Sequence, residues 1–166
     1  MMKRRPDNEQ ALAESFRAHM EAVRECYLRR DLEGYLAGFA DYYRSFQVGA
    51  DWKEDKAALR RKMEDDFARY DILEMDFSAH SIHIIGDRAY GHLHYQTKLN
   101  ARGDGRMVVD ERENIVVGKL LADGSWLLEA KIVLSVRMEH APSPEAAPAD
   151  AVSANPPSKE VDPCRK

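Results

Sequence analysis

The 166-residue chain has few cysteines and no long apolar run. Its two cysteines, Cys26 and Cys164, fall in a helix-like segment and in a polar tail, so they do not form the disulfide framework of a small secreted domain. The amino-terminal stretch MMKRRPDNEQ lacks the apolar segment of a signal peptide, and no later segment has the length of a membrane span. We therefore expect a cytoplasmic protein that has no membrane partner.

An excess of charge of one sign is also missing, because the formal net charge is only -4 and both signs are interspersed. No basic stripe could follow a phosphate backbone, so we expect no nucleic-acid partner. A phosphate-binding glycine loop, a nucleophile elbow and a zinc-type cysteine pair are absent as well. These absences exclude several enzyme classes, and we predict no cofactor and no metal.

Prolines are scarce in most of the chain, since six of the seven lie after Ala141. A segment rich in Pro, Ala and Ser cannot bury enough apolar surface to offset its ordering entropy. We predict disordered segments at 1–7 and 141–166 around a single domain at 8–140. The 44% of hydrophobic residues is enough for one core in a domain of this size.

Helical periodicity dominates the first half of the domain. Apolar residues at helical spacing predict an amphipathic helix over roughly 8–30, and Asp31 is placed to cap a short second helix. The aromatic stretch 42–48 is typical of a strand. Asp51 and Glu54 have the spacing of a capping box, which predicts a third helix that ends near Asp71.

From Ile72 to Met138 the period changes to two, which predicts four antiparallel strands joined by turns at 86–87, 103–105 and 123–124. The middle turn decides which side chains share the inner face. A two-residue loop would bring His92 and His94 beside apolar residues. A three-residue loop keeps the faces consistent, and it places Tyr95 directly opposite Glu113. In that register Arg112, Asn114 and Lys131 point to the outer face.

Three longer stretches carry a family resemblance: DWKEDKAALR, IIGDRAYGHLHY and LLADGSWLLEAKIVLS. Together with the order of elements, the chain resembles the nuclear transport factor 2-like superfamily, including its SnoaL-like and ketosteroid isomerase-like branches. The resemblance implies an α+β fold, a cone-shaped barrel in which a curved antiparallel sheet wraps around three N-terminal helices. It also implies an apolar cavity and a homodimer formed through the outer sheet face. Members differ widely in activity, so the resemblance implies no single function.

Four polar residues are predicted on the otherwise apolar inner face: His80, Tyr95, Glu111 and Glu113. A carboxylate in an apolar cavity has a raised pKa, so Glu113 is a candidate general base. Tyr95 is a candidate hydrogen-bond donor to a developing oxyanion, with His80 on the diagonal. The alternative is a structural pair in which Tyr95 and Glu113 satisfy each other.

Bulky apolar residues form the candidate ligand pocket: Phe39, Tyr43, Phe67, Trp126 and Ile132. The same residues also fit a plain hydrophobic core. On the predicted outer face, His92, His94 and His83 could hold a metal, but no carboxylate is predicted to converge on them. Surface or dimer-interface histidines are the favoured interpretation.

The function predicted from these features is binding of a small apolar ligand by a SnoaL-like protein. One alternative is a cofactor-independent isomerase, cyclase or dehydratase that acts on an apolar carbonyl compound by acid and base catalysis. Another is a protein-association module, whose interior should be filled by side chains.

Overall fold

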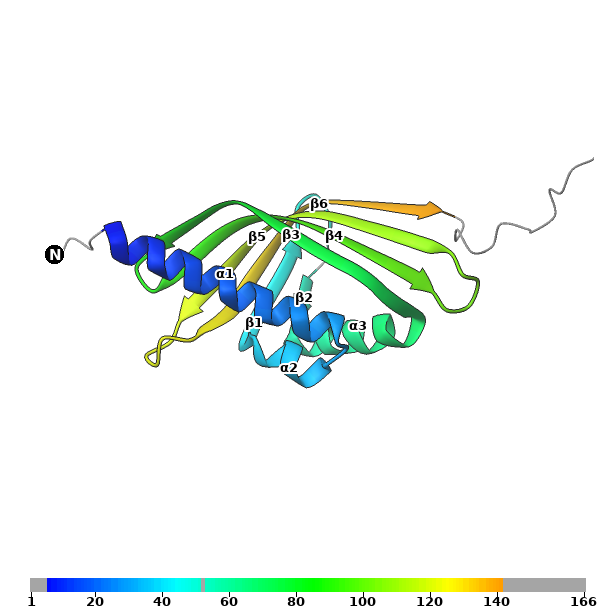
Figure 1. Ribbon diagram of the computed structural model, residues 1–166, viewed down its shortest axis with the longest axis horizontal. Coiled ribbons are helices and arrows are strands. Elements are labelled where there is room, and N and C mark those ends of the chain that lie inside the picture. Colours follow the sequence, from blue (N-terminus) through cyan, green and yellow to red (C-terminus); the bar gives the residue numbers. More distant parts are fainter. Residues whose placement is uncertain (1–5, 52, 142–166) are drawn as a thin grey trace, which may run out of the picture.

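A computed structural model describes residues 6–51 and 53–141, which form an α+β fold of three helices and six strands. In chain order the elements are α1 (Pro6–Leu28), α2 (Leu32–Ala37), β1 (Phe39–Gln47), β2 (Lys53–Asp55), α3 (Lys56–Arg69), β3 (Tyr70–Ile85), β4 (Arg88–Ala101), β5 (Met107–Leu120) and β6 (Trp126–Ala141). Figure 1 shows the long strands as one twisted sheet with the helices gathered on one side. The face toward the helices is called the inner face below, and the opposite one the outer face.

The helix and strand predictions hold with shifts at their ends. The first helix begins at Pro6, inside the segment predicted to be disordered, and the first strand begins at Phe39 rather than at residue 42. Asp31 caps α2 by accepting a hydrogen bond from the Gly34 amide at 2.9 Å, as predicted. The prediction that Asp51 opens the third helix is wrong, because Asp55 takes that role and residues 53–55 form a short strand. The last strand ends at Ala141, the first residue of the second segment predicted to be disordered, and the other disorder predictions fall on residues outside the described ranges.

The strands form one sheet in the order β2-β1-β6-β5-β4-β3. The four long strands are antiparallel neighbours, as predicted, whereas β1 runs parallel to β6 and returns the chain to the sheet after α2. Among the described residues no helix is both long and apolar enough to cross a membrane.

The middle hairpin departs from the prediction by one residue. Its loop holds the four residues 102–105, closed by a 2.9 Å hydrogen bond from the Ala101 amide to the Arg106 carbonyl. Gly105 has the expected positive φ of 68°. The extra loop residue pairs Tyr95 with Arg112 rather than with Glu113. Because a slip of one residue reverses every side chain of a strand, the predicted faces of β5 are wrong.

Register shifts in the last hairpin change the faces of β6 as well. Two irregularities interrupt the pairing of β5 with β6, one near Gly118 and one next to Glu113. Such bulges insert an extra residue and reorient the side chains around it. As a result Leu128 and Val133 are buried, Lys131 lines the interior, and Ile132 lies on the outer face, opposite to the prediction for Lys131 and Ile132.

One end of the inner face is solid hydrophobic core beneath α1. Phe16 is fully buried, and its ring lies so close to Gly118 that a Cβ atom there would be 2.2 Å from it. The Phe16 and Trp126 rings meet edge to face at 5.2 Å between centroids. The Trp126 indole donates a 2.9 Å hydrogen bond to the Ser15 hydroxyl. A glycine inside β5 thus makes room for the ring that anchors α1 to the sheet.

Candidate functional site

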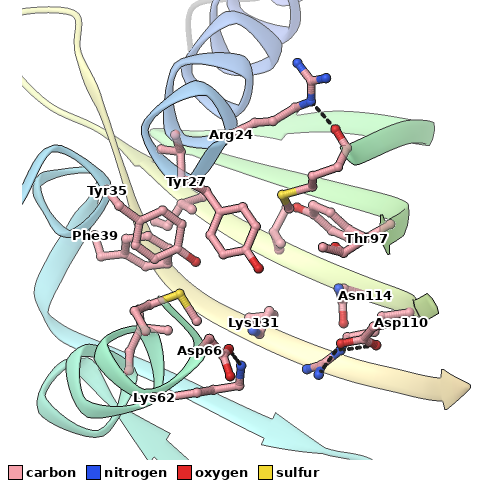
Figure 2. A pocket seen from close by; sticks show the side chains of 18 of the residues that line it. Arg24, Tyr27, Tyr35, Phe39, Lys62, Asp66, Thr97, Asp110, Asn114 and Lys131 are labelled. Carbon is pink, nitrogen blue, oxygen red and sulfur yellow. Dashed lines mark hydrogen bonds and ion pairs between the residues drawn. The ribbon is translucent and has the colours of Figure 1, made fainter. Parts of the chain in front are cut away.

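The other end of the inner face borders a cavity of about 370 Å³, which is within the usual range for small-ligand sites. Its walls come from all three helices, from β1 and from the four long strands, and Figure 2 shows these side chains around a central space. Six aromatic residues line the cavity: Tyr27, Tyr35, Phe39, Tyr43, Tyr70 and Tyr95. The cavity therefore offers flat apolar surfaces together with phenol groups.

The tyrosine hydroxyls stay protonated at neutral pH. Burial raises the pKa of Tyr95, and the neighbouring Tyr43 adds to this effect. The pKa of Tyr27 is also raised, mainly by burial and further by the nearby Asp66 and Asp110. A neutral phenol can donate a hydrogen bond, so these groups can serve a ligand oxygen without themselves being charged.

Charged side chains from the sheet and α3 gather at the opposite wall (Figure 2). The Arg112 guanidinium binds Asp110 through two contacts, Nε to Oδ1 at 2.9 Å and Nη2 to Oδ2 at 2.7 Å. On α3 the Lys62 amine is paired with Asp66 one turn along the helix. These two ion pairs leave their charges compensated.

Lys131 differs from these groups because its amine has no hydrogen bond or ion pair with any residue that the structure describes. Its side chain borders the cavity, so it is partly accessible from within while protein surrounds it. Burial lowers the pKa of Lys131 to about 8, since it penalises the ammonium form. The positive charges of Arg112 and Lys62 act in the same direction, and Glu54 opposes them.

Four buried side-chain oxygens lack hydrogen-bond partners among the described residues, and those of Asn114 and Glu54 are two of them. Asn114 Oδ1 on β5 and one carboxyl oxygen of Glu54 on β2 accept no hydrogen bond, and Asn114 lines the cavity. Burial raises the pKa of Glu54, although Lys131 and Lys62 counteract it. A buried acceptor without a donor costs about 1–3 kcal/mol, and a bound ligand that donates a hydrogen bond would remove that cost.

Comparison with known structures identifies the fold of this chain. No protein-family model and no curated protein matches the sequence. A conserved protein from Planctomyces limnophilus superimposes with a TM-score of 0.71 at 18% identity, covering 78% of this chain and 99% of that one. A ketosteroid isomerase-like protein from Erwinia carotovora atroseptica gives 0.62 at 14% identity, covering 74% and 94%. A nuclear transport factor 2-like protein from Cytophaga hutchinsonii gives 0.61 at 14% identity, covering 74% and 96%.

The chain has the nuclear transport factor 2-like fold. This outcome confirms the resemblance stated for the sequence. Because the identities are below 25%, the likeness concerns the fold and says nothing about an activity of this chain.

Within the nuclear transport factor 2-like fold, the predicted pocket residues separate into three groups. Phe39 and Tyr43 line the cavity, as predicted. Phe67 and Trp126 are buried in the core beside α1 but do not border the cavity. Ile132 pairs with Ile115 on the outer face, away from the cavity and from the core beside α1.

The predicted catalytic residues are divided between the two faces of the sheet. Tyr95 lines the cavity, whereas Glu113 points from the outer face and lies against His80, with 3.4 Å between His80 Nε2 and Glu113 Oε1. The predicted contact of Tyr95 with Glu113 is wrong because of the one-residue slip in the middle hairpin. This geometry does not assemble the proposed base and oxyanion donor in one site.

Sequence reasoning placed Lys131, Arg112 and Asn114 outside, although all three line the cavity. The sequence holds a signal for Arg112 and Asn114, though none for Lys131. Asp110, Arg112 and Asn114 occupy alternate positions of one strand and therefore share a face. Three polar residues on one face, followed on that face by Val116 and Gly118, are typical of a strand that is partly core and partly binding site.

Proposed function

We propose that the protein binds a small organic ligand, with a ring system against the cavity tyrosines and an anionic or carbonyl oxygen at Lys131. The observation that carries the proposal is the Lys131 amine, which faces a cavity of about 370 Å³ without a partner among the described residues. A buried cation without a counter-ion is costly, so an anionic ligand group at this place is stabilising.

The balance of charge in the cavity wall favours an anion over a cation. Apart from Lys131, the cationic groups of the described wall are in ion pairs: Arg24 with Glu25 and Asp76, Lys62 with Asp66, and Arg112 with Asp110. The nearby carboxyl of Glu54 is pushed toward its neutral form by burial. Lys131 is therefore the cationic group of this wall that has no ion pair within the described residues, although the carboxyl of Glu54 attracts it.

Hydrogen-bonding capacity narrows the ligand class further. Asn114 Oδ1 needs a donor, and the protonated phenols of Tyr27 and Tyr95 can supply donors. An aromatic or alicyclic acid that also carries a hydroxyl group meets these requirements. Flat rings stack or meet edge to face with tyrosine at little conformational cost.

Ligand-observed NMR with 2-naphthoate and its neutral analogue 2-naphthamide tests the proposal. We expect the naphthoate to bind and Lys131→Met to weaken its affinity about tenfold, which is one charge-assisted contact of about 1.4 kcal/mol. Lys119→Met removes a lysine from the other face of the sheet and should leave binding unchanged. Equal affinities of both probes for wild type and Lys131→Met would contradict the role of the amine.

A second candidate is cofactor-independent acid and base catalysis on a carbonyl compound, favoured by the pKa of Lys131 near 8. At neutral pH a fraction of such an amine is unprotonated and can remove a proton next to a carbonyl group. The phenol of Tyr95 or Tyr27 could donate a hydrogen bond to the enolate oxygen that forms. In this version Lys131 replaces Glu113 as the base of the predicted isomerase, cyclase or dehydratase.

Deuterium incorporation into 2-tetralone in heavy water distinguishes the second candidate from simple binding. A general base accelerates proton removal by about 10²–10⁴-fold, and Lys131→Met should abolish this acceleration. Exchange at the uncatalysed rate with the wild-type protein would reject catalysis and leave ligand binding in place.

We also propose a homodimer formed through the outer face. Apolar residues from adjacent strands adjoin there: Phe46 pairs with Ile132, Ile132 with Ile115, and Val117 lies beside Tyr90 on the next strand. Light scattering at micromolar concentration should give twice the chain mass, and Ile115→Lys should reduce it to that of a monomer. The cavity argues against the protein-association alternative, which requires an interior filled with side chains.

A further inference from the structure

Three side chains that commonly bind metals converge on the outer face of the sheet, away from the cavity. His80 comes from β3, His92 from β4 and Glu113 from β5, and their donor atoms all lie within 4.8 Å of one another. The Nε2 atom of His92 is 3.0 Å from Glu113 Oε2, and that of His80 is 3.4 Å from Glu113 Oε1. Each histidine thus presents a ring nitrogen to a different oxygen of one carboxylate.

The local backbone is irregular on both sides of this cluster. A register shift in the β3–β4 ladder leaves His80 and Ser81 both opposite His92. A second shift, in the β5–β6 ladder, follows directly after Glu113. Bulges of this kind redirect side chains and are enriched next to functional sites. Two of them flank these three residues.

We propose that His80, His92 and Glu113 bind a divalent transition-metal ion of the zinc type. Four donors around zinc at about 2.0–2.1 Å stand about 3.3 Å apart, close to the separations between each histidine nitrogen and the carboxylate. Two histidines and one glutamate are an established zinc ligand set that leaves the fourth position open. Imidazole nitrogens also disfavour Mg²⁺ and Ca²⁺, which prefer all-oxygen ligands.

Access and charge on the outer face are compatible with this ion. In the single chain the side chains of His80, His92 and Glu113 keep 51%, 42% and 32% of their surface exposed, so a metal ion can reach them, and in the proposed homodimer the ion would lie at or next to the interface. A second carboxylate, Glu111, lies on the same face and comes within 3.9 Å of the His94 ring. The acidic side chain adds negative potential next to the cluster, which favours a cation.

Calorimetric titration of the full-length, tag-free protein with Zn²⁺ tests the site, with Co²⁺ absorption as a report on ligand geometry. We expect one ion per chain. Loss of a group that merely orients a ligand costs about 10–100-fold in affinity, so His92→Ala and Glu113→Gln should each cost at least that much. His83→Ala is the matched control, because His83 belongs to β3 but lies outside the cluster, and it should bind as wild type does.

Thermal unfolding gives a second readout that does not depend on any activity. Zn²⁺ should raise the melting temperature of the wild-type protein and of His83→Ala, and leave that of Glu113→Gln unchanged, because only a ligand of the folded state stabilises it. Circular dichroism verifies that the variants are folded, and His80→Ala serves as an independent third ligand test. An equal loss of binding in His83→Ala and His92→Ala, or no one-to-one binding to the wild type, would overturn the proposal.

Discussion

The two ends of the inner sheet face are built from the same strands but have opposite character. Near α1, Gly118 and Trp126 enclose the fully buried Phe16, and the packing is dense. Toward the other end of the same strands, Arg112 and Lys131 border an open cavity. One end therefore stabilises the fold by burial, whereas the other keeps polar groups that lack part of their hydrogen-bond partners among the described residues.

The largest expected effect is at the packed end. Phe16→Ala removes a fully buried aromatic ring and should lower the free energy of unfolding by about 3–5 kcal/mol, measured by urea denaturation. Tyr95→Phe at the cavity end removes only a hydroxyl that has no hydrogen-bond partner among the described residues, so it should change stability by less than about 1 kcal/mol. Similar losses in both variants would remove the distinction between the two ends.

A second test concerns the glycine that accommodates the ring. Gly118→Ala places a Cβ atom 2.2 Å from Phe16 and should destabilise the fold by about 1–3 kcal/mol through overpacking. In the Phe16→Ala background the same substitution should cost almost nothing, because the clashing ring is gone. Additive effects in this double-mutant cycle would mean that the two residues do not touch.

The third test uses pH at the cavity end. Because the pKa of Lys131 is lowered to about 8 in the folded protein, the unfolded chain binds more protons between about pH 8 and its ordinary pKa. Stability should therefore rise with pH in this window. From pH 7 to 9.5 the wild type should gain about 2 kcal/mol relative to Lys131→Met. If the free energies of unfolding of the two proteins, measured by urea denaturation, changed with pH in parallel, the Lys131 amine would be solvated rather than buried.

The smallest expected effect is that of Asn114→Leu. The variant removes a buried acceptor that lacks a donor among the described residues, so stability should stay within about 1 kcal/mol of wild type or increase. Binding of 2-naphthoate serves as the control for an intact cavity. A loss of more than about 2 kcal/mol would show that the amide makes a structural hydrogen bond.

Sequence periodicity predicted the order of helices and long strands, and the resemblance predicted the fold, because both depend on patterns along many residues. The faces of β5 could not be predicted in the same way. Its more apolar set, with Ile115 and Val117, points outward, whereas Arg112 and Asn114 point inward. Apolar content marks the buried face of a strand only where that face is packed solid, and here part of it borders a polar cavity.

Only some contacts of the candidate site were predicted from the sequence. Proximity of His80 to Glu113 was predicted and is present at 3.4 Å, but on the opposite face from Tyr95. The length of the middle loop accounts for the error, since one additional residue between Ala101 and Arg106 exchanges the inward and outward side chains of β5. Glycine and aspartate mark the position of a turn more reliably than they mark the number of its residues.

Interstrand NOEs between the α and amide protons of β4 and β5 determine how these two strands pair, and this pairing places Arg112 in the cavity and Glu113 outside. We expect cross-strand contacts of Tyr95 with Arg112 and of His92 with Ile115. Contacts of Tyr95 with Glu113 would show that the strands pair in the other register, and would contradict both the cavity lining described above and the metal cluster.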